Sequence, residues 1–163
     1  IIRKNRTSVA ILDGTESWEE LDKLADDIQL YFGLGCRNIT QIHVPEGYDF
    51  VPLLQSLRKY AYFMDQHKYK HNFDYNLTIQ IMNNRYYMSN DSVLLSENPD
   101  PFSPISQVNY QFYSSSDKLA DILNAEKIQC IVGKGFILFG QSQRPGLDDY
   151  PDGVNTMQFL LSL

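Results

Sequence analysis

The sequence is poor in cysteine and lacks both a long apolar run and an excess of basic residues. Two cysteines, Cys36 and Cys130, are too few for a disulfide framework, and we interpret both as free thiols. With 20 acidic against 14 basic residues the net charge is −6, which argues against a nucleic-acid surface or an anionic membrane surface. No apolar run approaches the roughly 20 residues of a membrane helix, and no signal peptide is recognisable. We therefore expect a cytoplasmic protein with no membrane span.

Two further motifs that would identify a ligand are also missing. No Gly-x-Gly-x-x-Gly dinucleotide fingerprint occurs, and Gly133-Lys134-Gly135 lacks the frame of a phosphate-binding loop. The carboxylates of Asp148, Asp149 and Asp152 do not have the spacing of a calcium loop and are better explained by a solvated turn.

His67 and His71 are the only pair of histidines at helical spacing, four residues apart. On a helix both would lie on one face, as in a metal site, but the stretch lacks the flanking glutamate of a zinc-protease helix. Two histidines with scattered carboxylates do not make a metal site, so we expect none here. A general acid or base role for either histidine stays open.

What the sequence does contain is an alternation of strands and helices. Apolar and β-branched runs predict strands at 8–12, 38–44, 92–96, 105–113, 129–133 and 136–140. Helical periodicity and capping residues predict helices at 17–33, 48–66 and 114–127, with a polar loop at 67–76. The stretch 75–84 fits a short helix or a strand. This alternation predicts one α/β domain over 1–163 with a mostly parallel sheet.

Cys36 is the strongest candidate for a functional residue. It follows Gly33-Leu34-Gly35 in the turn between a predicted helix and a predicted strand, beside the cationic Arg37. An exposed thiol whose thiolate is stabilised is a nucleophile, and a backbone N–H at such a turn can stabilise an oxyanion. The alternative is a small buried residue under the helix, because cysteine is often buried. Cys130, inside an apolar run, is expected in the core.

These segments, in this order, resemble the catalytic domain of the aldehyde dehydrogenase superfamily, and most closely its LuxC-type acyl-CoA reductase branch. The most specific match is Gly-x-Gly-Cys-Arg-Asn at 33–38, within YFGLGCRNITQIHVPEGYDF. Segments at 1–12, 67–76, 103–113, 128–133 and 139–161 also resemble the family. The resemblance implies a three-layer α/β catalytic domain.

The resemblance also implies a reaction. Cys36 would form a thioester with the acyl group of an acyl-CoA, which NADPH then reduces to a fatty aldehyde, with the Cys36 amide as an oxyanion donor. Gly35, Arg37 and Asn38 would support the nucleophile. Family members associate as homo-oligomers, so we expect the full-length protein to do so.

Two positions depart from the aldehyde-oxidising branch. That branch opens its catalytic domain with Glu-Leu-Gly-Gly, whose glutamate activates water, whereas this chain has Arg3-Lys4-Asn5-Arg6. The missing carboxylate favours acyl exchange with CoA over hydrolysis. Where that branch has Glu-x-Phe-Gly-Pro, with the glutamate on the nicotinamide ribose, this chain has DPFSPI with the shorter Asp100.

The cofactor domain precedes the catalytic domain in this superfamily, which would explain the missing fingerprint. The chain also begins without methionine, so we expect a cofactor domain upstream and expect this chain alone not to turn over. Two alternatives remain: a thiol acyltransferase or thioesterase on the same scaffold, and a non-catalytic oligomerisation domain.

Overall fold

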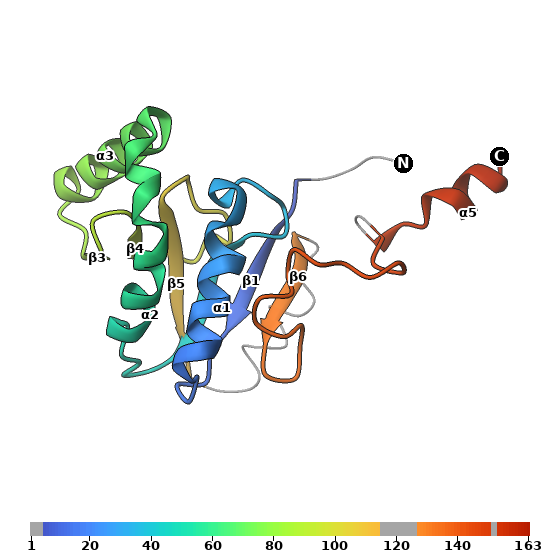
Figure 1. Cartoon of the computed structure of the whole chain (residues 1–163), viewed down its shortest axis with the longest axis horizontal. Coiled ribbons are helices and arrows are strands. Elements are labelled where there is room, and N and C mark those ends of the chain that lie inside the picture. The colour runs from blue at the N-terminus through green and yellow to red at the C-terminus, as the bar shows by residue number, and fades with distance from the viewer. Residues whose placement is uncertain (1–4, 115–126, 151–152) are drawn as a thin grey trace.

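A six-stranded β-sheet forms the centre of the molecule in the computed structural model, which describes residues 5–114, 127–150 and 153–163 (Figure 1). The strand order is β3-β4-β5-β2-β1-β6. Only the β3–β4 pair is antiparallel; the other pairs are parallel. The strands are β1 (Thr7–Ile11), β2 (Ile39–Pro45), β3 (Tyr87–Ser89), β4 (Leu94–Glu97), β5 (Gln107–Tyr113) and β6 (Ile128–Gly133). The mostly parallel α/β sheet is therefore confirmed.

Helices α1 and α2 pack on one face of this sheet (Figure 1). Ser17 caps α1 (Trp18–Gln29) in a capping box with Glu20, as predicted. The predicted helix at 48–66 is α2 (Val51–Ser56) continued by the 3₁₀ helix η2 (Leu57–Asp65). At the other end of the chain, α5 (Thr156–Leu161) stands apart from the sheet (Figure 1). In the described ranges, no helix has the length and apolarity needed to cross a membrane.

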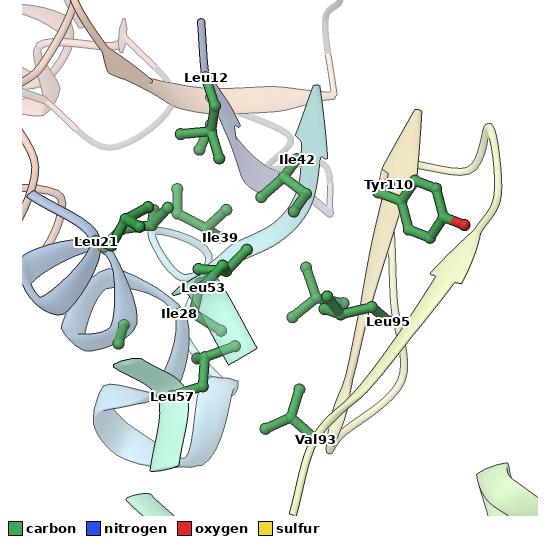
Figure 2. Close-up of a cluster of buried hydrophobic side chains, with 14 of the residues drawn as sticks. Leu12, Leu21, Ile28, Ile39, Ile42, Leu53, Leu57, Val93, Leu95 and Tyr110 are labelled. Atoms are coloured by element: carbon green, nitrogen blue, oxygen red, sulfur yellow. The ribbon is translucent and has the colours of Figure 1, made fainter. Parts of the chain in front are cut away.

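The hydrophobic core lies between the sheet and the α1–α2 layer, and Figure 2 shows how leucines of the two helices meet isoleucines of β2. Each fully buried side chain of this size contributes about 1.5–3 kcal/mol relative to an exposed one. The fully buried large residues on this face include Leu12, Leu24, Ile39, Ile42, Leu53, Leu57 and Leu95. This packing fixes the end of α1 against the start of β2, where the Cys36 turn lies.

The loop predicted at 67–76 is wrong, because these residues begin helix α3 (His67–Met82). The side chains that α3 buries are Tyr69, Phe73, Asn76 and Gln80, which form one stripe at helical spacing. Two of the four are amides, so hydrophobic periodicity alone could not detect the stripe. Both amides are satisfied: Asn76 Nδ2 donates to Ile105 O at 2.8 Å, and Gln80 Nε2 donates to Gln107 at 3.2 Å.

Three smaller differences concern one helix end and two strands. The helix predicted at 17–33 ends at Gln29, and the 3₁₀ turn η1 (Leu30–Gly33) follows it. The strand predicted at 136–140 is reduced to a single bridge between Ile137 and Val132. The short strand β3 was not predicted, and residues 115–126 of the third predicted helix lie outside the described residues.

On β2 and β5, the face of the sheet opposite the core is polar although much of it is buried. Gln41 and Asn109, which are register partners on β2 and β5, donate to the main chain of the segment that follows β4. His43 lies on the same face, is 3% exposed, and its Nε2 has no hydrogen-bond partner in the part of the chain that the structure describes. Burial lowers the pKa of His43 from 6.5 to about 4.

We predict that stability falls on acidification because of His43. The His43 imidazole takes up a proton near pH 6.5 in the unfolded chain but only near pH 4 in the folded chain. The contribution of neutral His43 is therefore complete above pH 6.5 and is lost as the pH falls towards 4, by about 3 kcal/mol. Urea unfolding of the wild type and of His43→Gln at pH 7 and pH 4.5 should show a shallower pH dependence for the variant. An equal loss of unfolding free energy between pH 7 and pH 4.5 in the two proteins would contradict the prediction.

Candidate active site

Cys36 lies on an exposed turn between α1 and β2, and it is a free cysteine. The chain leaves α1 through η1, where Tyr31, Phe32 and Gly33 all have positive φ values of 58–71°. These left-handed residues reverse the chain within one turn. Phe32, which lies within the helix predicted at 17–33, is instead 38% exposed in this turn. Its ring remains 4.3 Å from that of Phe63.

Asn38 holds this turn together from inside. Its side chain is fully buried, and its Nδ2 lies 2.9–3.1 Å from the carbonyl oxygens of Asp27, Ile28 and Leu30. Carbonyls at the end of a helix have no partner within the helix, so the Asn38 amide supplies the missing donors. Asn38 Oδ1 accepts from Gly35 N at 2.8 Å. Both ends of one side chain therefore fix the segment that carries Cys36.

Gly35 is required by the same contact. A Cβ at this position would lie 2.9 Å from Asn38 Oδ1, closer than side-chain carbons approach. Any other residue would push the Asn38 amide away from its partners. Gly35 and Asn38, both predicted to support Cys36, are thus brought together by the structure.

Ser8 joins the Cys36 turn to the two strands beneath it. Its hydroxyl donates to the carbonyl oxygen of Cys36 at 2.9 Å and accepts from Cys130 N at 3.2 Å. The Ser8 Oγ also lies 3.0 Å from the Sγ of Cys130. Ser8 was not predicted as a site residue, although a serine at the start of the apolar run SVAIL was a visible signal.

Cys130 has the environment expected of a structural cysteine. It is 8% exposed on β6, and burial is the largest cause that raises the pKa of its thiol. The charge of Arg37 acts in the opposite direction on the same thiol. The prediction that Cys130 lies in the core is confirmed, so the two thiols differ sharply in accessibility.

Two hollows flank the Cys36 turn. One, of about 490 Å³, is lined by Phe32 and Leu34 of the turn, by the first residues of α3 including Lys68 and Tyr69, and by Ile105. Its size is that of a small-molecule site, and its lining is largely apolar and aromatic. Since Leu34 is two residues from Cys36, their Cα atoms are at most about 7 Å apart.

The second hollow, of about 320 Å³, lies on the β6 side and carries charges of both signs. Arg6 and Arg37 line it together with Cys130, Asp148 and Asp149. The Asp149 carboxylate accepts from Gly146 N at 2.8 Å within an exposed turn, as expected for this stretch.

His67 and His71 lie on the first turns of α3 with their ring centroids 6.1 Å apart, and both are exposed. His67 lines the larger hollow. Among the described residues, no group of three metal-ligating side chains lies together. Asp100 follows β4, is exposed, and its Oδ1 accepts from Phe102 N at 3.0 Å. It does not line either hollow beside Cys36.

The comparisons with known proteins support the fold and no more. No protein-family model and no curated protein matches the chain. An NAD-dependent aldehyde dehydrogenase from Sinorhizobium meliloti aligns over 80% of this chain and 33% of its own length, with a TM-score of 0.54 and 10% identity. A mutant 1-pyrroline-5-carboxylate dehydrogenase from Thermus thermophilus aligns over 75% of this chain and 30% of its own length, with a TM-score of 0.48 and 11% identity.

The chain therefore shares its α/β fold with about a third of the Sinorhizobium meliloti aldehyde dehydrogenase, which confirms the predicted α/β class with a mostly parallel sheet. It spans about a third of the length of the two dehydrogenases. Neither of them is named as an acyl-CoA reductase, so that narrower assignment rests on the sequence resemblance.

The two thiols should react very differently with an alkylating reagent. We expect iodoacetamide to modify Cys36 in the folded chain, because it is exposed, and Cys130 only after unfolding. Intact mass should show one adduct in native buffer and two in urea. Cys36→Ser should show none in native buffer. Native labelling at Cys130 would contradict the accessibility described here.

Replacing Asn38 should destabilise the chain. Asn38→Ala leaves helix-end carbonyls and Gly35 N–H without partners in a buried place, which should cost about 1–3 kcal/mol in urea unfolding. The matched control is Asn83→Ala, whose exposed amide donates to Ile79 O at the end of α3. That variant should change stability by less than about 0.5 kcal/mol. Equal losses of stability in Asn38→Ala and Asn83→Ala would show that Asn38 contributes no more than an exposed helix cap does.

Proposed function

We propose that this chain is the cysteine-bearing part of an NADPH-dependent fatty acyl-CoA reductase. The observation that carries the proposal is the exposed thiol of Cys36 on a turn that Asn38 and Ser8 hold from below. A nucleophile must be accessible and fixed in position at the same time. An aldehyde-dehydrogenase fold and the Gly-x-Gly-Cys-Arg-Asn motif support the same assignment.

The proposed first step is acyl transfer. The Cys36 thiolate attacks the thioester carbonyl of the acyl-CoA, the new carbon–sulfur bond forms, and the bond to the CoA sulfur breaks. The leaving CoA thiolate takes up a proton. In the described part of the chain, no acceptor takes the N–H of Cys36, so this donor is available to the oxyanion that forms during attack.

The second step releases the aldehyde from Cys36. Bound NADPH would supply the hydride that reduces the acyl carbon. Cys36 then leaves as a thiolate, so that one thioester and one hydride give one aldehyde and the free thiolate. The chain lacks the opening carboxylate of the aldehyde-oxidising branch, having Arg3-Lys4-Asn5-Arg6 instead, which supports exchange with CoA over hydrolysis.

The described residues fit only one end of such a cofactor. The larger hollow presents the rings of Phe32 and Tyr69 and the amides of Gln66 and Asn72, which suit a flat ring that carries a carboxamide. Asp100 remains our candidate for a ribose contact. No Gly-rich phosphate cradle occurs in the sequence, so the rest of the cofactor, in this proposal, is bound by a domain upstream.

The proposal predicts that a long-chain acyl-CoA acylates the chain at Cys36. Dodecanoyl-CoA should add one acyl group, and peptide mapping should place it on Cys36. Cys36→Ser should abolish the adduct, because a serine hydroxyl stays protonated at neutral pH and is a far weaker nucleophile than a thiolate, whereas Cys130→Ser should retain it. In the longer protein, NADPH should release the acyl group as an aldehyde.

The outcomes separate the readings of this site. An adduct that persists in Cys36→Ser and disappears in Cys130→Ser would reassign the nucleophile. Release of the acyl group as an acid, with or without NADPH, would indicate a thioesterase. Absence of any adduct at an alkylatable Cys36 would remove the proposed reaction.

A further inference from the structure

A buried carboxylate lies one helical turn before the Cys36 turn. Asp27, near the end of α1, is 1% exposed, and burial raises the pKa of its carboxyl group above the ordinary value. Among the described residues it has no ion-pair partner, whereas the adjacent Asp26 pairs with Lys59 at 2.7 Å. A carboxylate buried in this way needs hydrogen bonds in place of water.

The hydrogen bonds of Asp27 come from a segment 113–115 residues away in the sequence. Gly140 N donates to Oδ2 at 2.6 Å, and Ser142 donates to Oδ1 through its N at 3.0 Å and its hydroxyl at 2.7 Å. Gly140 itself lies against α1, since a Cβ there would be 3.1 Å from the Cβ of Lys23. The carboxylate thus ties the 140–142 segment tightly to α1.

Ser142 and Asp27 also bind the side chains of the two residues that follow Cys36. Arg37 Nε donates to the main-chain carbonyl of Ser142. The main-chain carbonyl of Asp27 accepts from Asn38 Nδ2 at 3.1 Å. A closed path therefore runs from Asp27 through Ser142 to Arg37 and back through Asn38, and Cys36 lies directly beside it.

We infer that Asp27 is a positioning residue for Cys36, acting through Ser142 on Arg37. The inference rests on the proposed function in that Cys36 is taken as the nucleophile. Without the carboxylate, the 140–142 segment loses its attachment to α1, and Arg37 loses the fixed acceptor that sets its side chain. Asp27 does not touch the reacting atoms. Among the described residues, Asp26 and Cys130 also interact electrostatically with this site, and Arg6, Asp148 and Asp149 line the same hollow as Arg37.

The test is the single-turnover acylation of Cys36 by dodecanoyl-CoA over a range of concentrations. In Asp27→Asn one of the two carboxylate oxygens becomes an N–H₂ group that cannot accept from Gly140 or Ser142, so the attachment loses one of its two acceptors. The maximal rate should fall about 10- to 100-fold, the usual effect of misplacing a reacting group, while the half-saturating concentration stays unchanged. Asp26→Asn, one residue away on the same helix, is the matched control and should react like the wild type.

A double-mutant cycle shows whether Asp27 acts through Arg37. Asp27→Asn in an Arg37→Gln background should add little to the loss caused by Arg37→Gln alone. Additive losses, or a wild-type rate in Asp27→Asn, would overturn the inference. Thermal melts show which variants fold. If Asp27→Asn does not fold, Ser142→Ala replaces it in the test. This variant keeps the backbone donor of Ser142 and loses only the hydroxyl, so its acylation rate should fall less than the roughly 10- to 100-fold expected for Asp27→Asn.

Alkylation of Cys36 by iodoacetamide separates this inference from the proposed function. If the wild type is not acylated but alkylation of Cys36 slows severalfold in Asp27→Asn and not in Asp26→Asn, the positioning role stands and the reductase proposal fails. If the wild type is acylated and Asp27→Asn matches it in both reactions, the proposed function stands and the positioning role fails.

Discussion

The carbonyl groups at the end of α1 set the condition on which the Cys36 turn depends. A helix that ends inside a protein leaves acceptors that must find donors, because an unpaired buried polar group costs about 1–3 kcal/mol. Here Asn38, which follows the turn, hydrogen-bonds to three of these carbonyl groups. Because its side chain points inward to reach them, the chain continues into β2 with Cys36 on the outer side of the turn. The exposure of the thiol follows from how the helix is capped.

The core gives this turn its rigidity. The α1–α2 layer meets the sheet through buried leucines and isoleucines such as Leu21, Ile39 and Leu53, so neither α1 nor β2 can shift without opening a cavity (Figure 2). Ser8 and Asp27 extend this restraint to the main chain around Cys36. An exposed residue thereby has a position that the interior of the protein determines.

Local pattern predicted five of the six sheet strands and the first two helices, and it placed Cys36 in the turn between a helix and a strand, because each of these depends on neighbours in sequence. The capping box at Ser17 and the run Ile39–Val44 are of this kind. The residues that pattern could not find depend on partners far along the chain. In the sequence, Asp27 is one of several acidic residues on α1, and its role becomes recognisable only through its hydrogen bonds to Ser142. Helix α3 was missed because two of the side chains that it buries are the amides Asn76 and Gln80.

The placement of Asp27 also bears on which reaction the site favours. Hydrolysis of a thioester needs a base that can take a proton from water. Asp27 is the buried carboxylate tied to the Cys36 turn, yet one of its oxygens accepts from Gly140 and the other accepts twice from Ser142. A carboxylate that is 1% exposed and already accepts three hydrogen bonds is a structural acceptor and not a base for a water beside Cys36. In the proposed reaction, Asp27 therefore does not hydrolyse the acyl group on Cys36, which can then pass to a thiol or a hydride.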